Sequence, residues 1–220
     1  MAANDAANKP ICSPIALLPT LRPSRPIGTT VQGRKEAGIL KGMYLFRDGG
    51  TRPVAQPSVQ LLGSGTILRE VIAAADLLAS DFGVVADVWS CPSFTELRRE
   101  GLDVERWNLL HPAEPPRQSY VETCLGGRVG PVLAATDYIK AFADQIRPFV
   151  PSRYRVLGTD GFGRSDYRRK LRAFFEVDRH FVAVAALKAL ADEGTIKPSA
   201  VAEAIVRYGI DPEKPNPART

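Results

Sequence analysis

Short apolar runs alternate with amphipathic stretches along most of the chain. Four of these runs are bounded by glycine, proline or polar residues, which is typical of buried strands; they are Val59–Leu62, Val84–Trp89, Pro131–Ala135 and Tyr154–Leu157. A shorter run, Met43–Phe46, precedes the turn signal Asp48-Gly49-Gly50 and predicts an edge strand.

Helical periodicity fills the intervals between these runs. After the first buried run, one face of a predicted helix carries Ile67, Leu68, Val71, Ile72, Ala75 and Leu78, while Arg69, Glu70 and Asp76 fall largely elsewhere. Pro92-Ser93 opens a helical region that extends to Leu110, with Gly101 as a candidate break. Later helices are predicted from a stripe of Ile139, Phe142, Ile146 and Phe149, and over Tyr167–Phe175, Asp178–Asp192 and Ser199–Tyr208, with Asp178 and Ser199 as caps.

This order of elements predicts the fold class. Strands that are separated by helices pair in parallel through right-handed crossovers. We therefore expect an α/β protein, a three-layer α/β/α sandwich around a mostly parallel sheet. The length of 220 residues suits one such domain with a tail.

The composition excludes several classes of protein. The formal net charge of +5 is mildly basic and is interpreted as solvated surface, because no nucleic-acid motif accompanies it. Three widely spaced cysteines form no metal or disulfide pattern, which favours a reducing cytoplasm. No apolar run is long enough to span a bilayer. We expect neither a nucleic-acid partner nor a membrane.

The first 35 residues differ from the rest of the chain. They are proline-rich and show little helical periodicity, with prolines at positions 10, 14, 19, 23 and 26. We expect residues 1–35 to be disordered and dispensable, and residues 36–220 to form the folded domain.

Glycine patterns and histidines give weak chemical signals. Gly63-Ser64-Gly65 follows a strand, but Leu68 replaces the third glycine of a dinucleotide fingerprint, which favours a tight turn. His111 could transfer a proton in a cleft, or it could cap a helix and make a structural hydrogen bond. His180 is interpreted as a packing or surface residue. No catalytic triad or metal-ligand cluster is visible, so we assign no catalytic or metal-binding residue.

The loop from Thr159 to Asp166 is the best candidate for a cleft or an interface. It brings charges and a hydroxyl group to a turn that glycines make flexible, through Asp160, Arg164, Ser165 and Asp166. Phe162 is an apolar side chain between two glycines, so we expect it to contact an apolar surface. That surface could belong to a partner or to the same domain.

The same loop also carries a family resemblance. Its sequence, Gly158-Thr159-Asp160-Gly161-Phe162-Gly163-Arg164-Ser165-Asp166, occurs together with Ser93-Phe94-Thr95-Glu96-Leu97, Arg106-Trp107-Asn108 and Leu110-His111-Pro112. With these motifs the chain resembles, from about Glu36 onward, the C-terminal domain of the homodimeric pyruvate dehydrogenase decarboxylating component. That enzyme belongs to the transketolase-like thiamin-diphosphate family.

The resemblance implies a function that this chain does not perform alone. Members of the family decarboxylate pyruvate oxidatively and transfer the acetyl group to a lipoyl acyltransferase. Their preceding domains hold thiamin diphosphate and Mg²⁺, so no cofactor is expected in this chain. We expect an inactive domain that contacts the remaining domains of the enzyme or self-associates, with Phe162 as a candidate anchor. The alternatives are a stand-alone, non-enzymatic interaction or dimerisation module, a split subunit and a truncated gene product.

Overall fold

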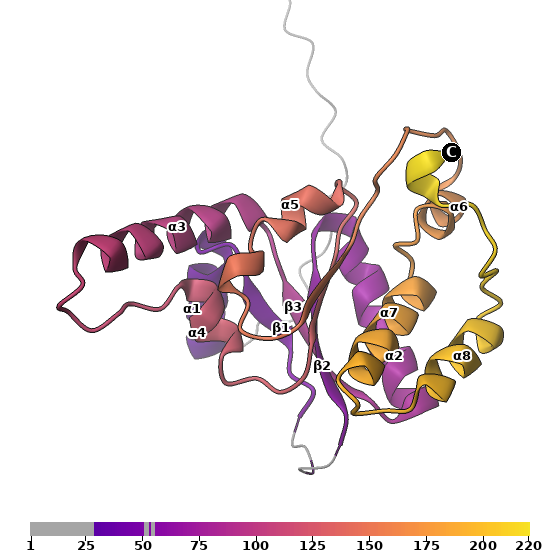
Figure 1. Cartoon of the computed structure of the whole chain (residues 1–220), viewed down its shortest axis with the longest axis horizontal. Helices are drawn as coiled ribbons and strands as arrows, with labels where there is room; N and C mark the ends of the chain where they lie inside the picture. Colours follow the sequence, from indigo (N-terminus) through magenta and orange to yellow (C-terminus); the bar gives the residue numbers. More distant parts are fainter. Residues whose placement is uncertain (1–28, 51–52, 54–55) are drawn as a thin grey trace, which may run out of the picture.

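The structure is a computed structural model that describes residues 29–50, 53 and 56–220. Its centre is a five-stranded sheet in the order β1-β3-β2-β4-β5 (Figure 1). The strands are β1 (Tyr44–Arg47), β2 (Ser58–Gly63), β3 (Val85–Ser90), β4 (Val132–Ala135) and β5 (Tyr154–Leu157). Strands β2 to β5 pair in parallel and β1 pairs antiparallel with β3. The prediction of a mostly parallel sheet is confirmed.

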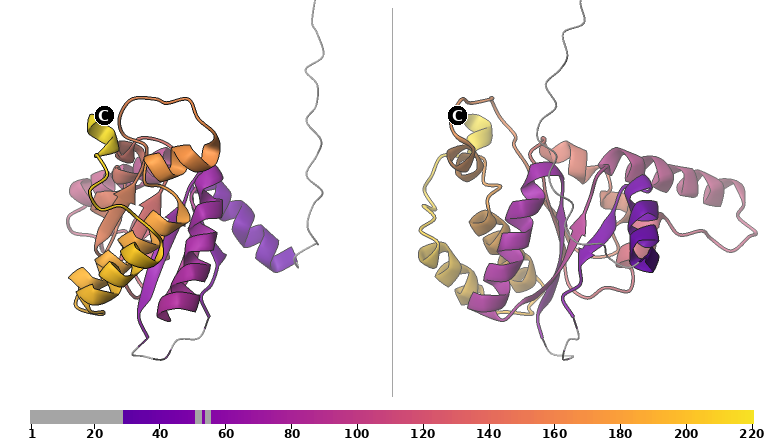
Figure 2. Two further views of the ribbon diagram at one scale, coloured as in Figure 1. Left: turned by 90° about the vertical axis from the view of Figure 1, so that its right-hand side faces the viewer. Right: turned by 180° about the vertical axis from the view of Figure 1, so that it is seen from behind.

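Helices cover both faces of the sheet, as Figure 2 shows from two further sides. Their bounds are α1 (Thr29–Leu40), α2 (Leu68–Phe82), α3 (Phe94–Leu110), α4 (Tyr120–Leu125), α5 (Lys140–Asp144), α6 (Arg168–Phe174), α7 (Arg179–Asp192) and α8 (Pro198–Arg207), with the short 3-10 turns η1 (Gly65–Ile67), η2 (Arg147–Phe149) and η3 (Pro217–Arg219).

Two apolar cores hold the three layers together. Alternate residues of each strand face opposite sides of the sheet, so Leu61 joins the core under α2 and α7, whereas Leu62 joins the core under α3 and α4. Trp89 is buried in the second core, where its indole N–H donates to Gln60 Oε1 over 2.9 Å. The α/β/α sandwich is therefore confirmed.

The topology creates a crevice at the carboxyl edge of the sheet. The chain leaves β2 for β3 on one side and later reaches β4 on the other side of β2. In the register of the sheet, Gly63 pairs with Ala135, and Ala135 pairs with Leu157. The three segments that follow β2, β4 and β5 therefore begin side by side. Ligands of open parallel sheets bind at such a switch point.

Three local predictions are wrong. Helix α3 runs unbroken through Gly101, where a Cβ atom would lie 2.5 Å from the Phe149 ring, so the glycine serves close packing. The expected stripe after β4 is only half buried, because α5 ends at Asp144 and the polypeptide continues as η2. Ser199 lies within α8, whose N-cap is Lys197.

Two further differences concern helices that the sequence patterns did not predict. Helix α4 begins with a capping box, in which Ser119 and Glu122 each accept a backbone N–H from the other. Helix α1 begins at Thr29. Residues 29–35, which we expected from the sequence to belong to the disordered tail, are helical in this structure and follow the last proline of the tail at position 26. The rest of that tail, residues 1–28, lies outside the described residues, so the expectation of disorder there stays a prediction.

Candidate functional site

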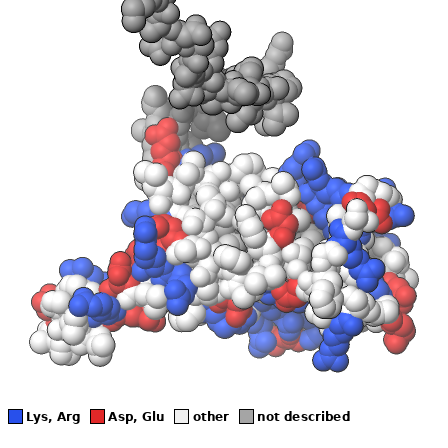
Figure 3. Space-filling view, turned by 90° about the horizontal axis from the view of Figure 1, so that it is seen from above, with Lys and Arg blue, Asp and Glu red and all other residues white. Residues whose placement is uncertain are grey.

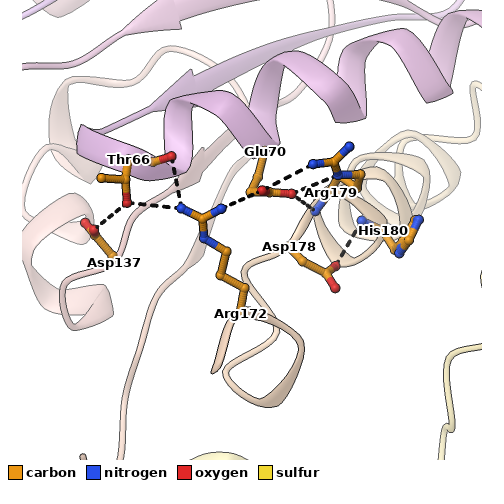
Figure 4. A network of polar contacts seen from close by, with 7 residues as sticks. All are labelled: Thr66, Glu70, Asp137, Arg172, Asp178, Arg179 and His180. Carbon is orange, nitrogen blue, oxygen red and sulfur yellow. Dashed lines mark hydrogen bonds and ion pairs between the residues drawn. The ribbon is translucent and has the colours of Figure 1, made fainter. Parts of the chain in front are cut away.

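Asp137 ties together the three segments at the switch point. Thr66, which follows β2, donates its hydroxyl to Asp137 Oδ2 over 3.1 Å (Figure 4). Thr159, which follows β5, donates its hydroxyl to the Asp137 carbonyl over 2.8 Å. One residue after β4 therefore fixes the connections from both neighbouring strands.

A buried carboxylate extends this network along α2. Glu70 lies in the first turn of α2 and is 6% exposed. Its Oε1 accepts from Arg172 Nη1 over 2.7 Å, and its Oε2 accepts from Arg179 Nε over 2.9 Å. Arg172 also reaches the carbonyl and hydroxyl oxygens of Thr66. Figure 4 shows both arginines pointing at Glu70 from α6 and the start of α7.

The electrostatics of Glu70 indicate a structural role. Burial alone would raise the pKa of this carboxyl, but hydrogen bonds and charge from Arg179, with a further contribution from Arg172, bring its pKa below its usual value. A carboxyl with a lowered pKa holds no proton at neutral pH. Glu70 therefore anchors two arginines and is not a candidate general acid.

Two cavities flank α6. The smaller has a volume of about 470 Å³, and we call it the switch-point pocket; it is lined by Thr66, Ile67, Asp137, Thr159, Gly161, Gly163, Arg164, Arg168, Leu171, Arg172, Phe175 and Val177. The larger, of about 960 Å³, lies among α6, the start of α7 and the end of α8. His180 lines this larger cavity, where its ring stacks on Tyr208.

The predicted loop residues separate into two groups. Arg164 lines the switch-point pocket, and its guanidinium lies 4.2 Å from the centre of the Phe174 ring. Asp160 points to α5 instead and accepts the backbone N–H of Lys140 over 2.8 Å. Ser165 and Asp166 are exposed, and Asp166 accepts only the backbone N–H of the next residue among the described hydrogen bonds.

Phe162 projects from the surface, and the residue is 79% exposed. The alternative that it packs within its own domain is therefore wrong for this structure. An exposed phenylalanine at the tip of a loop is available to a partner, so the interface hypothesis for Phe162 stays a prediction.

His111 lies apart from the loop, at the far end of the projecting helix α3 (Figure 1). Its Nδ1 is 2.8 Å from the Trp107 carbonyl oxygen, and its ring stacks on the Trp107 ring with centroids 4.4 Å apart. Arg117 covers the same indole. This arrangement matches a structural hydrogen bond at a helix end, and it does not bring His111 together with Asp160, Arg164 or Asp166.

The remaining chemical groups offer little reactivity. Burial raises the pKa of the Cys91 thiol well above its usual value, which keeps it protonated. Among the described residues, no three His, Cys, Asp or Glu side chains gather as a metal site. Within the same part of the chain, no helix combines the length and apolar character needed to cross a bilayer.

Sequence reasoning missed the residues that organise the site. Asp137 had a usable signal, because it is a polar residue at the end of a buried strand. Glu70 was placed off the apolar face of its helix, yet it is buried. Its partners Arg172 and Arg179 lie more than one hundred residues away in the chain, so periodicity within α2 gave no sign of them.

Comparison with known proteins identifies the family. Residues 42–178 match the model of the transketolase-like TK C-terminal domain. The pyruvate dehydrogenase E1 component of Pseudomonas aeruginosa is 68% identical over 183 residues, which cover 83% of this chain and 20% of that protein. The Escherichia coli K12 protein of the same description is 53% identical over 183 residues, with the same coverage of 83% and 20%.

A solved structure also aligns with this chain. Transketolase from Campylobacter jejuni matches with a TM-score of 0.47 and 19% identity, covering 68% of this chain and 19% of that chain. The chain thus spans about a fifth of the length of the curated relatives that it matches. It belongs to the transketolase-like C-terminal domain family and is similar, over most of its length, to pyruvate dehydrogenase E1 components.

Proposed function

We propose that this chain acts as the C-terminal domain of a pyruvate dehydrogenase E1 component. The observation that carries the proposal is the 68% identity over 83% of the chain. The complete enzyme would decarboxylate pyruvate oxidatively in the cytoplasm and pass the acetyl group to a lipoyl acyltransferase. In that enzyme this domain supplies a rigid wall and a docking surface for the catalytic domains.

Thiamin diphosphate would stabilise the carbanion in the complete enzyme. Among the described side chains, no three His, Cys, Asp or Glu residues gather around a possible position for its magnesium. The switch-point pocket contributes one carboxylate, that of Asp137. We therefore assign the cofactor to the remaining part of the enzyme and give this chain no step in the chemistry.

The docking surface lies at the carboxyl edge of the sheet. Viewed from above, the middle of this face is mostly uncharged, with one acidic patch within it (Figure 3). Large apolar side chains are exposed on two adjoining segments here: Tyr138, Ile139 and Phe142 at α5, and Phe162 in the loop. The segments adjoin because the Thr159 N–H donates to the Tyr138 carbonyl. Several large apolar side chains exposed on one face are typical of an interaction surface.

The preceding part of an E1 polypeptide is the occupant that fits this surface. About four-fifths of the length of each relative lies outside the matched region. We propose that this remaining length includes the surface that the domain contacts. A second copy of this chain is the rival occupant.

The purified chain is expected to show no decarboxylation of pyruvate when thiamin diphosphate, Mg²⁺ and an electron acceptor are supplied. A chimera of the P. aeruginosa enzyme, in which residues 36–220 of this chain replace the matching region, should retain activity. The same enzyme without that region should lose it. Turnover by the isolated chain that disappears on immunodepletion would contradict inactivity, and a folded but inactive chimera would contradict the proposed function.

Phe162→Ala tests the docking surface. In the chimera we expect it to weaken domain association by about 2 kcal/mol, the typical cost of truncating a buried interface aromatic. In the isolated chain it should leave the free energy of unfolding unchanged, because the side chain is exposed. Urea denaturation measures both.

Val206→Ala is the matched control. Val206 is also exposed, at 81%, but it lies on α8. It should not weaken domain association, and it should change the free energy of unfolding by less than about 0.7 kcal/mol, the range of helix propensity among ordinary residues. If sedimentation instead shows that the isolated chain forms a dimer that Phe162→Ala weakens, the occupant is a second copy and the module alternative replaces our assignment.

A further inference from the structure

The switch-point pocket contains an arginine that no described acid neutralises. Arg172 and Arg179 share Glu70. Arg168 lies one turn before Arg172 and lines the pocket, yet its guanidinium has no ion pair, hydrogen bond or ring contact within the described part of the chain. An arginine beside a cavity with no partner of its own is free to bind an anion.

Arg164 places a second guanidinium on the same pocket. Its guanidinium carbon lies 4.2 Å from the centre of the Phe174 ring. A cation–π contact restricts the side chain without using its N–H groups as hydrogen-bond donors to a protein acceptor. Two guanidiniums that line one cavity suit an oxyanion such as phosphate, because each can donate more than one hydrogen bond.

The loop between these groups adds backbone donors. Among the described residues, no protein acceptor receives the N–H groups of residues 160–165. Gly161 and Gly163 both line the pocket, so no side chain of theirs covers the backbone there. The loop packs closely against the C-terminal segment. A Cβ atom on Gly161 would lie 2.4 Å from the Pro217 carbonyl oxygen, so only glycine allows this approach.

Apolar side chains also line the pocket; they are Ile67, Leu171, Phe175 and Val177. The volume of about 470 Å³ lies in the range of small-molecule sites. A ligand that joins one anionic group to a carbon skeleton would contact both the arginines and the apolar side chains, whereas free phosphate would leave the apolar side chains in contact with water.

The carboxylate of Asp137 lowers the affinity of the pocket for an anion. It lines the same pocket and repels an anion. Its contacts with Thr66 are compatible with an amide, because the Thr66 hydroxyl donates to one oxygen. The pocket therefore has a built-in opposing charge that can be removed without changing the shape of the side chain.

We propose that the switch-point pocket binds a small phosphate monoester, with the phosphate between Arg164 and Arg168 and the organic group against Leu171 and Phe175. This binding site goes beyond the proposed function and does not depend on it. The isolated chain carries all of the residues that the site needs.

Calorimetric titration of the 220-residue chain at constant ionic strength tests the site. Phenyl phosphate should bind more tightly than inorganic phosphate. Arg168→Gln should weaken phenyl phosphate binding about tenfold or more, the usual effect of losing a hydrogen bond to a charged group. Arg169→Gln is the matched control, because Arg169 is the next residue of α6 and lines only the larger cavity among those described. It should leave affinity within about twofold, since it removes the same charge without a contact.

Asp137→Asn should tighten phenyl phosphate binding several-fold. Circular dichroism of each variant shows whether the fold is retained. If the Arg168 and Arg169 substitutions weakened phenyl phosphate binding equally, the binding would depend only on the overall positive charge. That result would contradict a specific site. Inorganic phosphate binding as tightly as phenyl phosphate would overturn the monoester assignment, and the absence of saturable binding would overturn the proposal altogether.

Discussion

Glu70→Gln is expected to destabilise the domain by about 2 kcal/mol, because it removes the charge that pairs with the largely buried Arg172, whereas the second partner, Arg179, is about half exposed and stays hydrated. Glu70 is the single carboxylate that Arg172 and Arg179 share at the junction of α2, α6 and α7. Urea denaturation of the purified chain would measure the change in the free energy of unfolding.

Glu203→Gln provides the comparison. Glu203 pairs with Arg207 at 2.9 Å on α8, but both side chains are exposed. Exposed pairs of this spacing contribute about 0.3–0.5 kcal/mol. Similar losses for the two substitutions would show that the Glu70 network adds no more than a surface pair.

The pH dependence of stability gives a second measure of Glu70. Its pKa in the folded chain is below the ordinary value of 4.5. The stabilisation from this lowered pKa is complete above the pKa of the unfolded chain and is lost as the pH falls through the folded value. Below pH about 4.5, the original chain should lose stability more steeply than the Glu70→Gln variant. If both proteins lost stability equally as the pH fell, the lowered pKa of Glu70 would be contradicted.

Gly130→Ala is expected to destabilise the domain by about 3 kcal/mol or more, from backbone strain and a clash that neighbouring side chains cannot relieve. Gly130 has a φ of +93°, and a Cβ atom there would lie 1.8 Å from the Ser58 carbonyl oxygen. Ser58 begins β2 and Gly130 precedes β4. The alanine would therefore push apart two strands that form the switch point.

Gly194→Ala separates strain from the clash. Gly194 also has a positive φ, of +74°, but a Cβ atom would meet nothing within 4 Å. Gly194→Ala should lower the free energy of unfolding by about 1–2 kcal/mol, the usual penalty of a left-handed conformation for a residue with a side chain. Equal effects in thermal or urea unfolding would mean that the contact with Ser58 relaxes freely.

The strands were predictable because the sheet is covered on both faces. Val132–Ala135 and Tyr154–Leu157 appear in the sequence as short apolar runs between breakers, and the structure begins and ends them within one residue of the prediction. Helix α5 was less predictable. Ile139 and Phe142 keep helical spacing with Ile146 and Phe149, but spacing does not show that the helix stops after five residues.

The site was predictable only in part, because its contacts join distant segments. Glycines and charges marked the loop from Thr159 to Asp166, and Arg164 does line a pocket. Asp160, from the same loop, turns away to α5. Which loop residue faces which neighbour depends on the register of β4 and β5 and on the C-terminal segment at Pro217. Local sequence patterns show neither the strand register nor the position of the C-terminal segment.

The two outer strands of the sheet determine how copies of this domain can meet. Strands β1 and β5 are four residues long, and the pairing of β1 with β3 shifts register between Leu45 and Arg47. Each outer strand also carries an arginine that is paired with an acid on a helix, Arg47 with Asp76 and Arg155 with Asp192. Short, irregular and charged edges are poor templates for fibrils that grow by adding strands. Any association between copies of the domain should therefore occur through side chains, without a continuous intermolecular sheet.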